Sequence, residues 1–372
     1  MKIGICCFPT VGGSGIAATQ LAIELAKKDH EVYLISYDTP FLLRSSRHPN
    51  ITLELVDILS YPLFKDIGDP YTILAASKMV ELVTREKLDI LHIHYAIPTG
   101  VSAYLTKLIT NVPVVITAHG SDIHILGVDP SYNSIISHAF QNVDGISTVS
   151  KFMKKEIYDK FAKNQDVRVI YNPIDIEKYQ KIETQICDFR LQYDTNFVHV
   201  SNFRPVKDTP FIVEAFAEVL KEKSDLGLIL VGEGPERKKC EELACKLGIR
   251  DNVIFQGVRS YIAPIYNCAT ALLSASKNES FGLTLAEAMA CETPAIAPRV
   301  GGVPEVIDHE VNGYLYELGD KKSLVDYMIR LLNDEKLKNR LGKAGREKVV
   351  NNFSGSEIAE EYIKWYKKVL ND

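Results

Sequence analysis

Two glutamates flank a segment whose backbone is suited to bind an anion. Glu279 precedes a helix that we expect to begin near residue 283, and Glu287 lies about one turn inside that helix. Amides at a helix N-terminus lack helical partners and attract negative charge. Here these amides belong to Ser280, Phe281, Gly282 and Leu283. Because carboxylates bind hydroxyl groups better than phosphates, the whole stretch suits a hydroxyl, a diphosphate and a second hydroxyl, as in a nucleotide sugar.

Two cations lie in the loop that follows an apolar run at residues 197–200. Arg204 and Lys207 are three residues apart, and fixed cations of this kind can neutralise a diphosphate. Either residue alone would be interpreted as an ordinary surface charge. A strand, a glycine turn and a helix follow at residues 231–237, with Pro235 near the helix start, which by itself indicates only favourable turn chemistry.

A glycine-rich turn follows the first apolar run of the chain. Gly12 and Gly13 would let backbone amides approach an anion at the start of a helix expected from residue 16. Gly13, Gly15 and Ala18 also fit Gly-x-Gly-x-x-Ala, and Asp38 lies twenty residues further on, which raises the alternative of a dinucleotide site. A tight structural turn without a ligand is the other interpretation, because short motifs also match by chance.

Histidines gather near the ends of two expected strands. His92 and His94 lie on one face of a strand, His119 follows another strand, and Asp122 and His124 come just after it. A metal site is one interpretation of this group. No run of carboxylate ligands accompanies the histidines, which favours the other interpretation: His119 hydrogen-bonds a substrate, and His92 is a core residue with satisfied hydrogen bonds.

The elements that must position these residues are apolar strands and amphipathic helices that alternate along the chain, which is typical of parallel sheets covered by helices. In the first half, the expected strands are 2–8, 31–36, 52–56, 90–94, 114–118, 145–149 and 167–170, and helices are expected at 16–28, 71–85 and 101–109. In the second half, the expected strands are 197–200, 226–231, 253–256, 271–274, 295–297 and 313–316, and the expected helices are 209–221, 235–247, 283–290, 323–332 and 356–370.

The alternation stops once, at a turn-rich stretch from Tyr171 to Asp175, and then restarts. The fold class is therefore α/β, with two doubly wound domains in tandem, at residues 1–170 and 171–354. Periodicity does not show which domain the last helix joins. Ligand crevices form at the carboxyl ends of parallel strands, so we expect the site in a cleft that the two domains face.

The composition argues against several classes of function. The 372 residues include 43 Lys and Arg against 48 Asp and Glu, and the resulting net charge of −5 argues against non-specific nucleic-acid binding. We see no apolar run long enough to span a membrane and no signal-peptide pattern at the N-terminus. The seven cysteines are odd in number and have no Cys-x-x-Cys spacing, which favours reduced cysteines in a cytoplasmic protein.

Four stretches together make the sequence resemble a known family. Over essentially its whole length it resembles the retaining glycosyltransferases of the GT-B fold, in the glycogen-synthase-like family 4 group. The stretches are the glutamate pair around Ser-Phe-Gly, Gly301-Gly-Val-Pro-Glu305, Val231-Gly-Glu-Gly-Pro235 and His119-Gly-Ser-Asp122. The resemblance implies two Rossmann-like domains, the first for the acceptor and the second for a nucleotide sugar. It also implies that a C-terminal helix within residues 355–372 crosses back to the first domain.

Within this group, the sequence is most similar to members that transfer N-acetylglucosamine from UDP-GlcNAc to L-malate, the first step of bacillithiol synthesis. The similar stretches are residues 7–15, 92–98 and 200–207. Asn202 stands where the wider group has an arginine, five residues before the lysine, and this departure supports the narrower resemblance. Three alternatives remain: the same fold with a lipid or cell-wall sugar as acceptor, an NAD-dependent oxidoreductase, and a catalytically silent sensor of nucleotide sugars.

The resemblance also implies roles for individual residues. Lys207 and Arg204 would stabilise the leaving UDP, Glu279 would bind sugar hydroxyls, Glu287 would bind the ribose, and His119 would bind the sugar or the acceptor. The implied catalytic residues are His119, Lys207, Arg204 and Glu279. The implied donor-binding residues are Gly12, Gly13, Ser280, Phe281, Gly282, Leu283 and Glu287. The implied acceptor-binding residues are Ser14, Tyr95, Thr117 and Arg259.

No metal or other cofactor is expected. The sequence contains no Asp-x-Asp, the usual metal-binding diphosphate motif. The resemblance favours attack of the acceptor on the face that the leaving group occupies, with the donor phosphate assisting deprotonation. The expected partners are the small molecules UDP-GlcNAc and L-malate, without nucleic acid and without stable membrane anchoring, and a homo-oligomer is compatible with the sequence.

Overall fold

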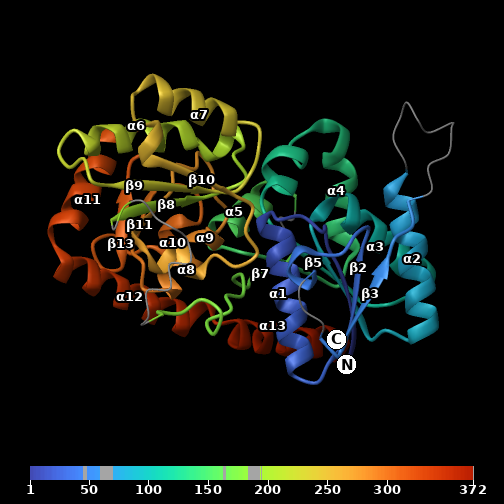
Figure 1. Ribbon diagram of the computed structural model, residues 1–372. Helices are drawn as coiled ribbons and strands as arrows, with labels where there is room; N and C mark the ends of the chain where they lie inside the picture. The colour runs from blue at the N-terminus through green and yellow to red at the C-terminus, as the bar shows by residue number, and fades with distance from the viewer. Residues whose placement is uncertain (45–47, 59–69, 162–164, 183–192, 194, 372) are drawn as a thin grey trace. The chain divides into compact units, whose positions relative to one another are not determined.

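The computed structural model describes residues 1–44, 48–58, 70–161, 165–182, 193 and 195–371. The chain divides into two compact units (Figure 1). Unit 1 comprises Met1–Pro173 and Gly355–Asp372, and unit 2 comprises Ile174–Ser354. The first boundary lies inside the turn-rich stretch that the sequence marks as a linker.

Unit 1 is built on a seven-stranded parallel sheet with the order β3-β2-β1-β4-β5-β6-β7. The central strands are buried on both faces, which explains why their sequences are continuous apolar runs rather than alternating ones. The strands are β1 (Lys2–Cys6), β2 (Glu31–Ser36), β3 (Ile51–Leu55), β4 (Ile90–His94), β5 (Val114–Ala118), β6 (Gly145–Thr148) and β7 (Val167–Val169).

Helices connect the strands of unit 1. Side-chain caps begin two of them: Asp129 accepts a hydrogen bond from the Ser131 amide at the start of α4, and Ser150 accepts one from the Met153 amide at the start of α5. The helices are α1 (Gly13–Lys27), α2 (Tyr71–Glu86), α3 (Val101–Thr110), α4 (Pro130–Asn142) and α5 (Lys151–Lys160), with short helical turns η1 (Phe41–Leu43), η3 (Ala96–Gly100) and η4 (Asp122–Leu126).

The last helix, α13 (Gly355–Asn371), belongs to unit 1, although the chain reaches it from unit 2. It lies beside α1 (Figure 1). Tyr362 and Trp365 are buried in the same core as the side chains of β1 and α1, and Lys28 forms an ion pair with Glu360 at 2.8 Å. This confirms the crossing C-terminal helix that the family resemblance implies.

Unit 2 is built on a six-stranded parallel sheet with the order β10-β9-β8-β11-β12-β13. Its strands are β8 (Asn196–Val200), β9 (Gly227–Val231), β10 (Val253–Gly257), β11 (Ala269–Leu273), β12 (Ala295–Pro298) and β13 (Gly313–Tyr316). Its helices are α6 (Thr209–Leu220), α7 (Arg237–Lys246), α8 (Ala263–Asn267), α9 (Leu283–Ala290), α10 (Val303–Val306), α11 (Lys321–Asn333) and α12 (Glu335–Phe353), with short turns η5 (Pro205–Lys207) and η6 (Arg250–Asn252). In both units the first strand lies next to the fourth, which is the doubly wound Rossmann order.

The expected elements agree with the observed ones to within a few residues, with two kinds of difference. The first helix begins at Gly13 rather than near residue 16, because the glycines that were interpreted as a turn form its first turn. Five further helices, α4, α5, α8, α10 and α12, are not among the helices expected from the sequence.

Among the described cysteines, Cys268 differs from expectation. Cys268 is disulfide-bonded, so the prediction of reduced cysteines is wrong for this residue. The fold can join cysteines that are distant in the sequence, which spacing alone does not reveal. Of the others, Cys6, Cys7, Cys240 and Cys291 are free and buried, Cys245 is free and exposed, and Cys187 lies outside the described residues.

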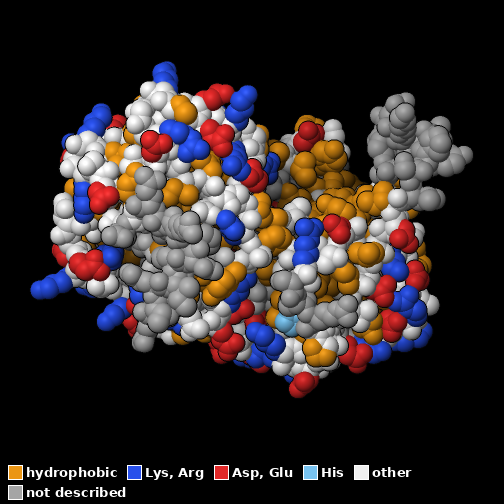
Figure 2. All heavy atoms as spheres, in the orientation of Figure 1, with side chains coloured by type: hydrophobic (Ala, Val, Ile, Leu, Met, Phe, Trp, Pro, Cys, Tyr) orange, Lys and Arg blue, Asp and Glu red, His pale blue; other side chains and the backbone are white. Residues whose placement is uncertain are grey.

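Unit 1 carries an apolar surface patch over η4 and α4. Figure 2 shows hydrophobic side chains gathered around α4, and Ile125, Val128, Tyr132 and Ile135 each expose between 41% and 56% of their surface. Exposed patches of this kind often mark interaction surfaces. A homo-oligomer stays a prediction. None of the helices in the described part of the chain is both long and apolar enough to cross a membrane.

Candidate active site

The sequence-predicted residues of unit 1 follow its central strands. Gly12, Gly13 and Ser14 follow β1, Tyr95 follows β4, and His119 follows β5. β1 and β4 are neighbours at which the strand order reverses, and a ligand crevice forms at the carboxyl ends of such strands. In unit 2 the equivalent neighbours are β8 and β11, and the cation loop and the Glu279 segment follow these two strands. In each unit, these candidate residues therefore follow the strands at which the topology predicts a site.

The glycine turn after β1 packs tightly against the start of α1. Gly12 caps the helix, and Gly13 is its exposed first residue. A Cβ atom at Gly15 would lie 2.6 Å from the carbonyl oxygens of both Phe8 and Thr10. Gly15 therefore allows α1 and the preceding turn to approach each other closely. The amides in the first turn of α1 lack helical partners and could bind an anion.

His119 is held by its backbone and by its ring. The buried carboxylate of Asp122 accepts hydrogen bonds from the amides of His119 (3.1 Å), Gly120 (2.7 Å) and Ala96 (2.8 Å). Burial raises the pKa of Asp122, and these amide donors oppose the rise. His119 is a partly buried residue, and its ring contacts His94 with 2.8 Å between His119 Nε2 and His94 Nδ1. Sequence reasoning gave Asp122 no positioning role, although a carboxylate three residues after a strand-end histidine was a usable signal.

His92 lies in a buried network with residues of β5, β6 and α13. Its Nε2 lies 2.6 Å from Thr117 Oγ1, and its Nδ1 lies 2.6 Å from the Tyr366 hydroxyl. Thr117 Oγ1 also lies 2.6 Å from Ser147 Oγ and 3.2 Å from the Tyr362 hydroxyl. The interpretation of His92 as a satisfied core histidine is confirmed. The structure places Thr117 fully inside this network, and its acceptor contact stays a prediction.

The other candidate acceptor residues of unit 1 lie at its predicted crevice. The Tyr95 hydroxyl lies 2.5 Å from Ser121 Oγ, and the Tyr95 ring packs edge-on against Phe8 with 5.5 Å between ring centroids. Ser14 is half-buried in the first turn of α1. Across the described residues, no group of three or more His, Cys, Asp or Glu side chains is arranged to hold a metal ion.

In unit 2, a glycine loop supports the loop that carries the two cations. A Cβ atom at Gly232 would overlap the carbonyl oxygen of Ser201, and one at Gly234 would overlap that of Asn202. Both glycines also have positive φ, so the strand-end turn after β9 fits only without side chains. The Val-Gly-Glu-Gly-Pro stretch therefore sets the position of the residues that precede Arg204 and Lys207.

The structure brings Lys207 together with Glu279. Lys207 Nζ donates to Glu279 Oε2 at 2.6 Å, and both side chains are partly buried. The Gly301-Gly302 turn fixes the backbone of Glu279, because the Gly302 amide donates to the Glu279 carbonyl at 2.9 Å. Gly301 has a φ of 53°, and a Cβ atom there would overlap that same carbonyl oxygen. The spacing of the motifs did not reveal this arrangement.

Beside this ion pair, α9 begins at Leu283, as expected. Gly282 precedes it with a φ of 101°, a left-handed conformation that favours glycine. Ser280, Phe281 and Gly282 therefore lie before the helix, and its unpartnered amides start at Leu283. The Phe281 side chain is buried against Phe353, with 5.1 Å between ring centroids, so a ligand contact by Phe281 would involve its backbone.

Glu287 lies inside α9 and is buried. Its Oε2 accepts a hydrogen bond from the Tyr266 hydroxyl at 3.1 Å. Burial raises the pKa of Glu287 to about 7, while hydrogen bonds from Tyr266 and Tyr179 and the charge of Lys178 oppose that rise. Near neutral pH, this group can therefore be either a hydrogen-bond donor or an acceptor.

The two arginines of the prediction differ in their surroundings. Arg204 is exposed and immediately precedes the turn that carries Lys207. Arg259 follows β10, the edge strand of the sheet, and its guanidinium donates to the backbone oxygen (3.1 Å) and the side-chain oxygen (2.5 Å) of Gln256. The acceptor-binding role of Arg259 stays a prediction.

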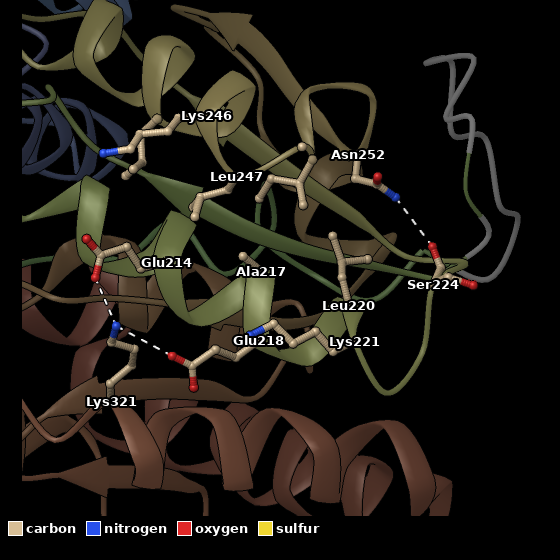
Figure 3. Close-up of a pocket in the computed structure, with 13 residues that line it drawn as sticks. Glu214, Ala217, Glu218, Leu220, Lys221, Ser224, Lys246, Leu247, Asn252 and Lys321 are labelled. Carbon is tan, nitrogen blue, oxygen red and sulfur yellow. Dashed lines mark hydrogen bonds and ion pairs between the residues drawn. The ribbon is translucent and has the colours of Figure 1, made fainter.

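A cavity of about 580 Å³ lies on the outside of unit 2, lined by α6, the end of α7 and the residues that lead into β10 (Figure 3). Lys321 reaches toward two glutamates of α6 there, with Nζ 2.9 Å from Glu214 and 3.5 Å from Glu218. None of the predicted site residues lines this cavity. It is therefore separate from the candidate site.

Comparison with known proteins assigns the class. The model of the family described as Glycosyltransferase Family 4 matches residues 11–178, and that of Glycosyl transferases group 1 matches residues 190–348. The chain belongs to the family 4 glycosyltransferases. It is 40% identical to the N-acetyl-alpha-D-glucosaminyl L-malate synthase of Bacillus anthracis, over 100% of this chain and 98% of that protein. It is also 29% identical to an uncharacterized glycosyltransferase of Methanocaldococcus jannaschii, over 98% of this chain and 96% of that protein.

Solved structures share the fold. A sucrose-phosphate synthase from Thermosynechococcus elongatus matches with a TM-score of 0.84 at 22% identity, covering 100% of this chain and 99% of that one. Anabaena HepE, solved in complex with UDP and glucose, matches with a TM-score of 0.83 at 19% identity, covering 99% and 100%. The expected fold class of two Rossmann-like α/β domains is confirmed. Membership of the glycosyltransferase family also overturns the alternative interpretation of the chain as an NAD-dependent oxidoreductase.

Proposed function

We propose that this enzyme transfers N-acetylglucosamine from UDP-GlcNAc to L-malate, with retention at the anomeric carbon and without a metal ion. The relative from Bacillus anthracis supports the choice of substrates, because its name gives the product as N-acetyl-alpha-D-glucosaminyl L-malate and the identity extends over the whole chain. The observation that carries the chemistry is the Lys207–Glu279 pair beside the N-terminus of α9. It combines a cation, free amides and a carboxylate, as a sugar diphosphate requires.

On the donor side, the proposal assigns the leaving group to unit 2. Lys207, with Arg204 and the first amides of α9, would stabilise the negative charge that develops on the departing UDP. Glu279 would turn from Lys207 to the sugar hydroxyls once the diphosphate has bound, and Glu287 would accept hydrogen bonds from the ribose. In unit 1, Gly12 and Gly13 would present amides to a phosphate of the donor.

On the acceptor side, the two carboxylates of L-malate need hydrogen-bond donors. Ser14 and Tyr95 carry hydroxyls at the carboxyl-terminal edge of the unit 1 sheet, and Arg259 would supply a cation. A reaction of this kind would be the first step in making a low-molecular-weight thiol, bacillithiol, and we propose that it takes place in the cytoplasm.

A lipid acceptor is the second candidate function. A Streptococcus pneumoniae relative, named as an alpha-monoglucosyldiacylglycerol synthase, is 27% identical over 85% of this chain and 75% of that protein. The exposed apolar patch over η4 and α4 is the feature of this chain that favours such an acceptor.

One assay separates these functions. Purified protein is incubated with UDP-GlcNAc and, in turn, L-malate, other hydroxy acids, sugars and diacylglycerol vesicles, and release of UDP is measured with and without a chelator. The proposal predicts release that depends on L-malate and is insensitive to the chelator. Release that depends on the vesicles, or that is the same without L-malate, would reject it.

A further inference from the structure

Two stacked histidines share a single hydrogen bond in unit 1. His94 Nδ1 lies 2.8 Å from His119 Nε2, and the rings stack with 5.1 Å between centroids and 28° between planes. His94 is 2% exposed. Burial holds the pKa of His94 well below its usual value and lowers that of His119 to about 3, so both rings are neutral at neutral pH.

The bond between these rings couples their tautomers. A neutral imidazole carries one N–H and one bare nitrogen, and a hydrogen bond needs one of each. Either His94 donates from Nδ1, and His119 then carries its proton on Nδ1, or His119 donates from Nε2, and His94 then carries its proton on Nε2. The surroundings of the remaining His94 nitrogen distinguish these two arrangements.

His94 Nε2 is buried and has no hydrogen-bond partner among the described residues. If His119 were the donor, the only N–H of His94 would lie on this unpartnered nitrogen. A buried unsatisfied donor costs about 1–3 kcal/mol, and orphaned N–H groups are rarer in proteins than under-satisfied acceptors. The arrangement with His94 as donor avoids that orphaned N–H.

We propose that His94 is a positioning residue that fixes His119 in the tautomer protonated on Nδ1. In that tautomer, Nε2 of His119 is occupied by His94, and the ring has no bare nitrogen left to accept a proton. His119 then acts as a hydrogen-bond donor to a ligand and not as a general base. This consequence rests on the proposed function: the ligand atom would be a sugar or acceptor oxygen, and deprotonation of the acceptor would fall to the donor phosphate.

The backbone of His119 supports this fixed role. The Asp122 carboxylate accepts hydrogen bonds from the amides of His119 and Gly120. His119 is therefore held in place at its main chain as well as at its ring. As a residue, His119 is nonetheless partly exposed rather than fully buried. A clamped ring with one defined N–H is suited to recognise an oxygen in a fixed position.

The tautomer can be measured directly in the ligand-free protein. Nitrogen-15 histidine labelling and long-range proton–nitrogen NMR distinguish the two ring nitrogens, and the His119→Gln variant identifies the His119 signals. We expect Nδ1 of His119 and Nδ1 of His94 to carry the protons. Protonation of His119 at Nε2 would overturn the proposal. Because no turnover is needed, this result is independent of whether the proposed function is correct.

A pair of variants tests the consequence for turnover. The amide nitrogen of Asn lies two bonds beyond Cβ, like Nδ1 of histidine, so His94→Asn keeps a donor for His119, whereas His94→Leu fills similar space without one. By analogy with the residues that orient metal-bound histidines, we expect kcat/KM for UDP-GlcNAc to fall about 10–100-fold in His94→Leu. We expect His94→Asn to restore most of this loss.

A purely structural role for His94 would give a different pattern. It would lower the thermal midpoint of both variants and leave their kcat/KM equal, which would contradict the proposal. His138→Leu, at an exposed histidine on α4, is the control and should keep wild-type kcat/KM. If His94→Leu does not fold, the NMR measurement and the comparison of His94→Asn with wild type still test whether His94 fixes the tautomer of His119.

Discussion

At the scale of single residues, the ion pair between Lys207 and Glu279 is the clearest chemical feature. The side chains come from positions 72 residues apart and are 24% and 21% exposed, so a bound anion can still reach the ammonium group. A diphosphate would compete with the carboxylate for Lys207. Under the proposed function, the ammonium group would exchange the carboxylate for the diphosphate, and its charge should affect turnover more than folding.

Replacing Lys207 by Met should lower kcat about 10²-fold or more, because the charge that we propose stabilises the leaving group is lost. The thermal midpoint should change little, since a partly exposed ion pair contributes little to stability. Steady-state assays of UDP release measure the first effect and calorimetry the second. Lys238→Met, at a highly exposed lysine on α7, is the control. A Lys207→Met enzyme with near-wild-type kcat would remove the proposed role.

Glu287 should make the enzyme less stable as the pH rises. Its pKa is raised from 4.5 to about 7 in the folded protein, so between these values the folded state holds a proton that the unfolded state has lost. Stability therefore decreases from about pH 4.5 to about pH 7. The variant Glu287→Gln removes this dependence and should be more stable than wild type at pH 8, by up to about 3 kcal/mol. Urea unfolding at pH 5 and pH 8 measures the difference, and equal wild-type-to-variant differences at the two pH values would contradict it.

At the scale of elements, loops fix one another through glycine contacts rather than through side-chain bonds. The turn at Gly301 and Gly302 packs directly against the backbone of Glu279. In the same way, the turn at Gly232 and Gly234 packs against the loop that leads to Lys207. Neither contact leaves room for a Cβ atom. The positions of the charged groups therefore depend on residues that carry no chemistry themselves.

Gly301→Ala should lower kcat/KM more than it lowers stability. A Cβ atom there overlaps the Glu279 carbonyl oxygen and would displace that residue. Gly319→Ala is a matched control, because Gly319 also has positive φ (85°) but has nothing within 4 Å of the added Cβ atom. Both variants carry the backbone strain, roughly 1–2 kcal/mol, so the difference between them isolates the crowding. Equal kcat/KM values in the two variants would show that the turn does not position Glu279.

Tyr366→Phe should weaken the attachment of α13 to the sheet of unit 1. It removes the hydroxyl at 2.6 Å from His92 Nδ1 and leaves that buried nitrogen without this partner, at a cost of about 1–3 kcal/mol. Tyr362→Phe should cost less, because Thr117, 3.2 Å from the Tyr362 hydroxyl, keeps His92 and Ser147 as partners. Unfolding midpoints measure both, and a larger effect at Tyr362 would contradict the assignment.

The elements that sequence reasoning found and those that it missed differ in a physical way. The strands were predictable because burial on both faces requires apolar runs. Helix α12 was not, because few of its residues are apolar and it contains Gly342 and Gly345, which usually indicate loops. In the structure these glycines let α12 approach α9 and the turn at Glu292 closely. A glycine required by packing cannot be distinguished from a helix breaker by local pattern.

At the scale of the whole molecule, the two Rossmann-like units could be predicted from the alternation of strands and helices, and the crossing of α13 only from the family resemblance. The candidate residues of each unit were predictable as strand-end positions. Their contacts were not, because Lys207 with Glu279, and His94 with His119, meet across different strands. Spacing within one strand or loop does not determine such pairs.

The most direct test of this account is the identity of the product formed from UDP-GlcNAc and L-malate. Mass spectrometry and proton NMR of the reaction mixture, with UDP quantified in parallel, give the product, its linkage and its stoichiometry. The account predicts one N-acetylglucosaminyl malate with the α configuration for each UDP released. Free N-acetylglucosamine, a β-linked product, or UDP release without any glycosylated malate would contradict it.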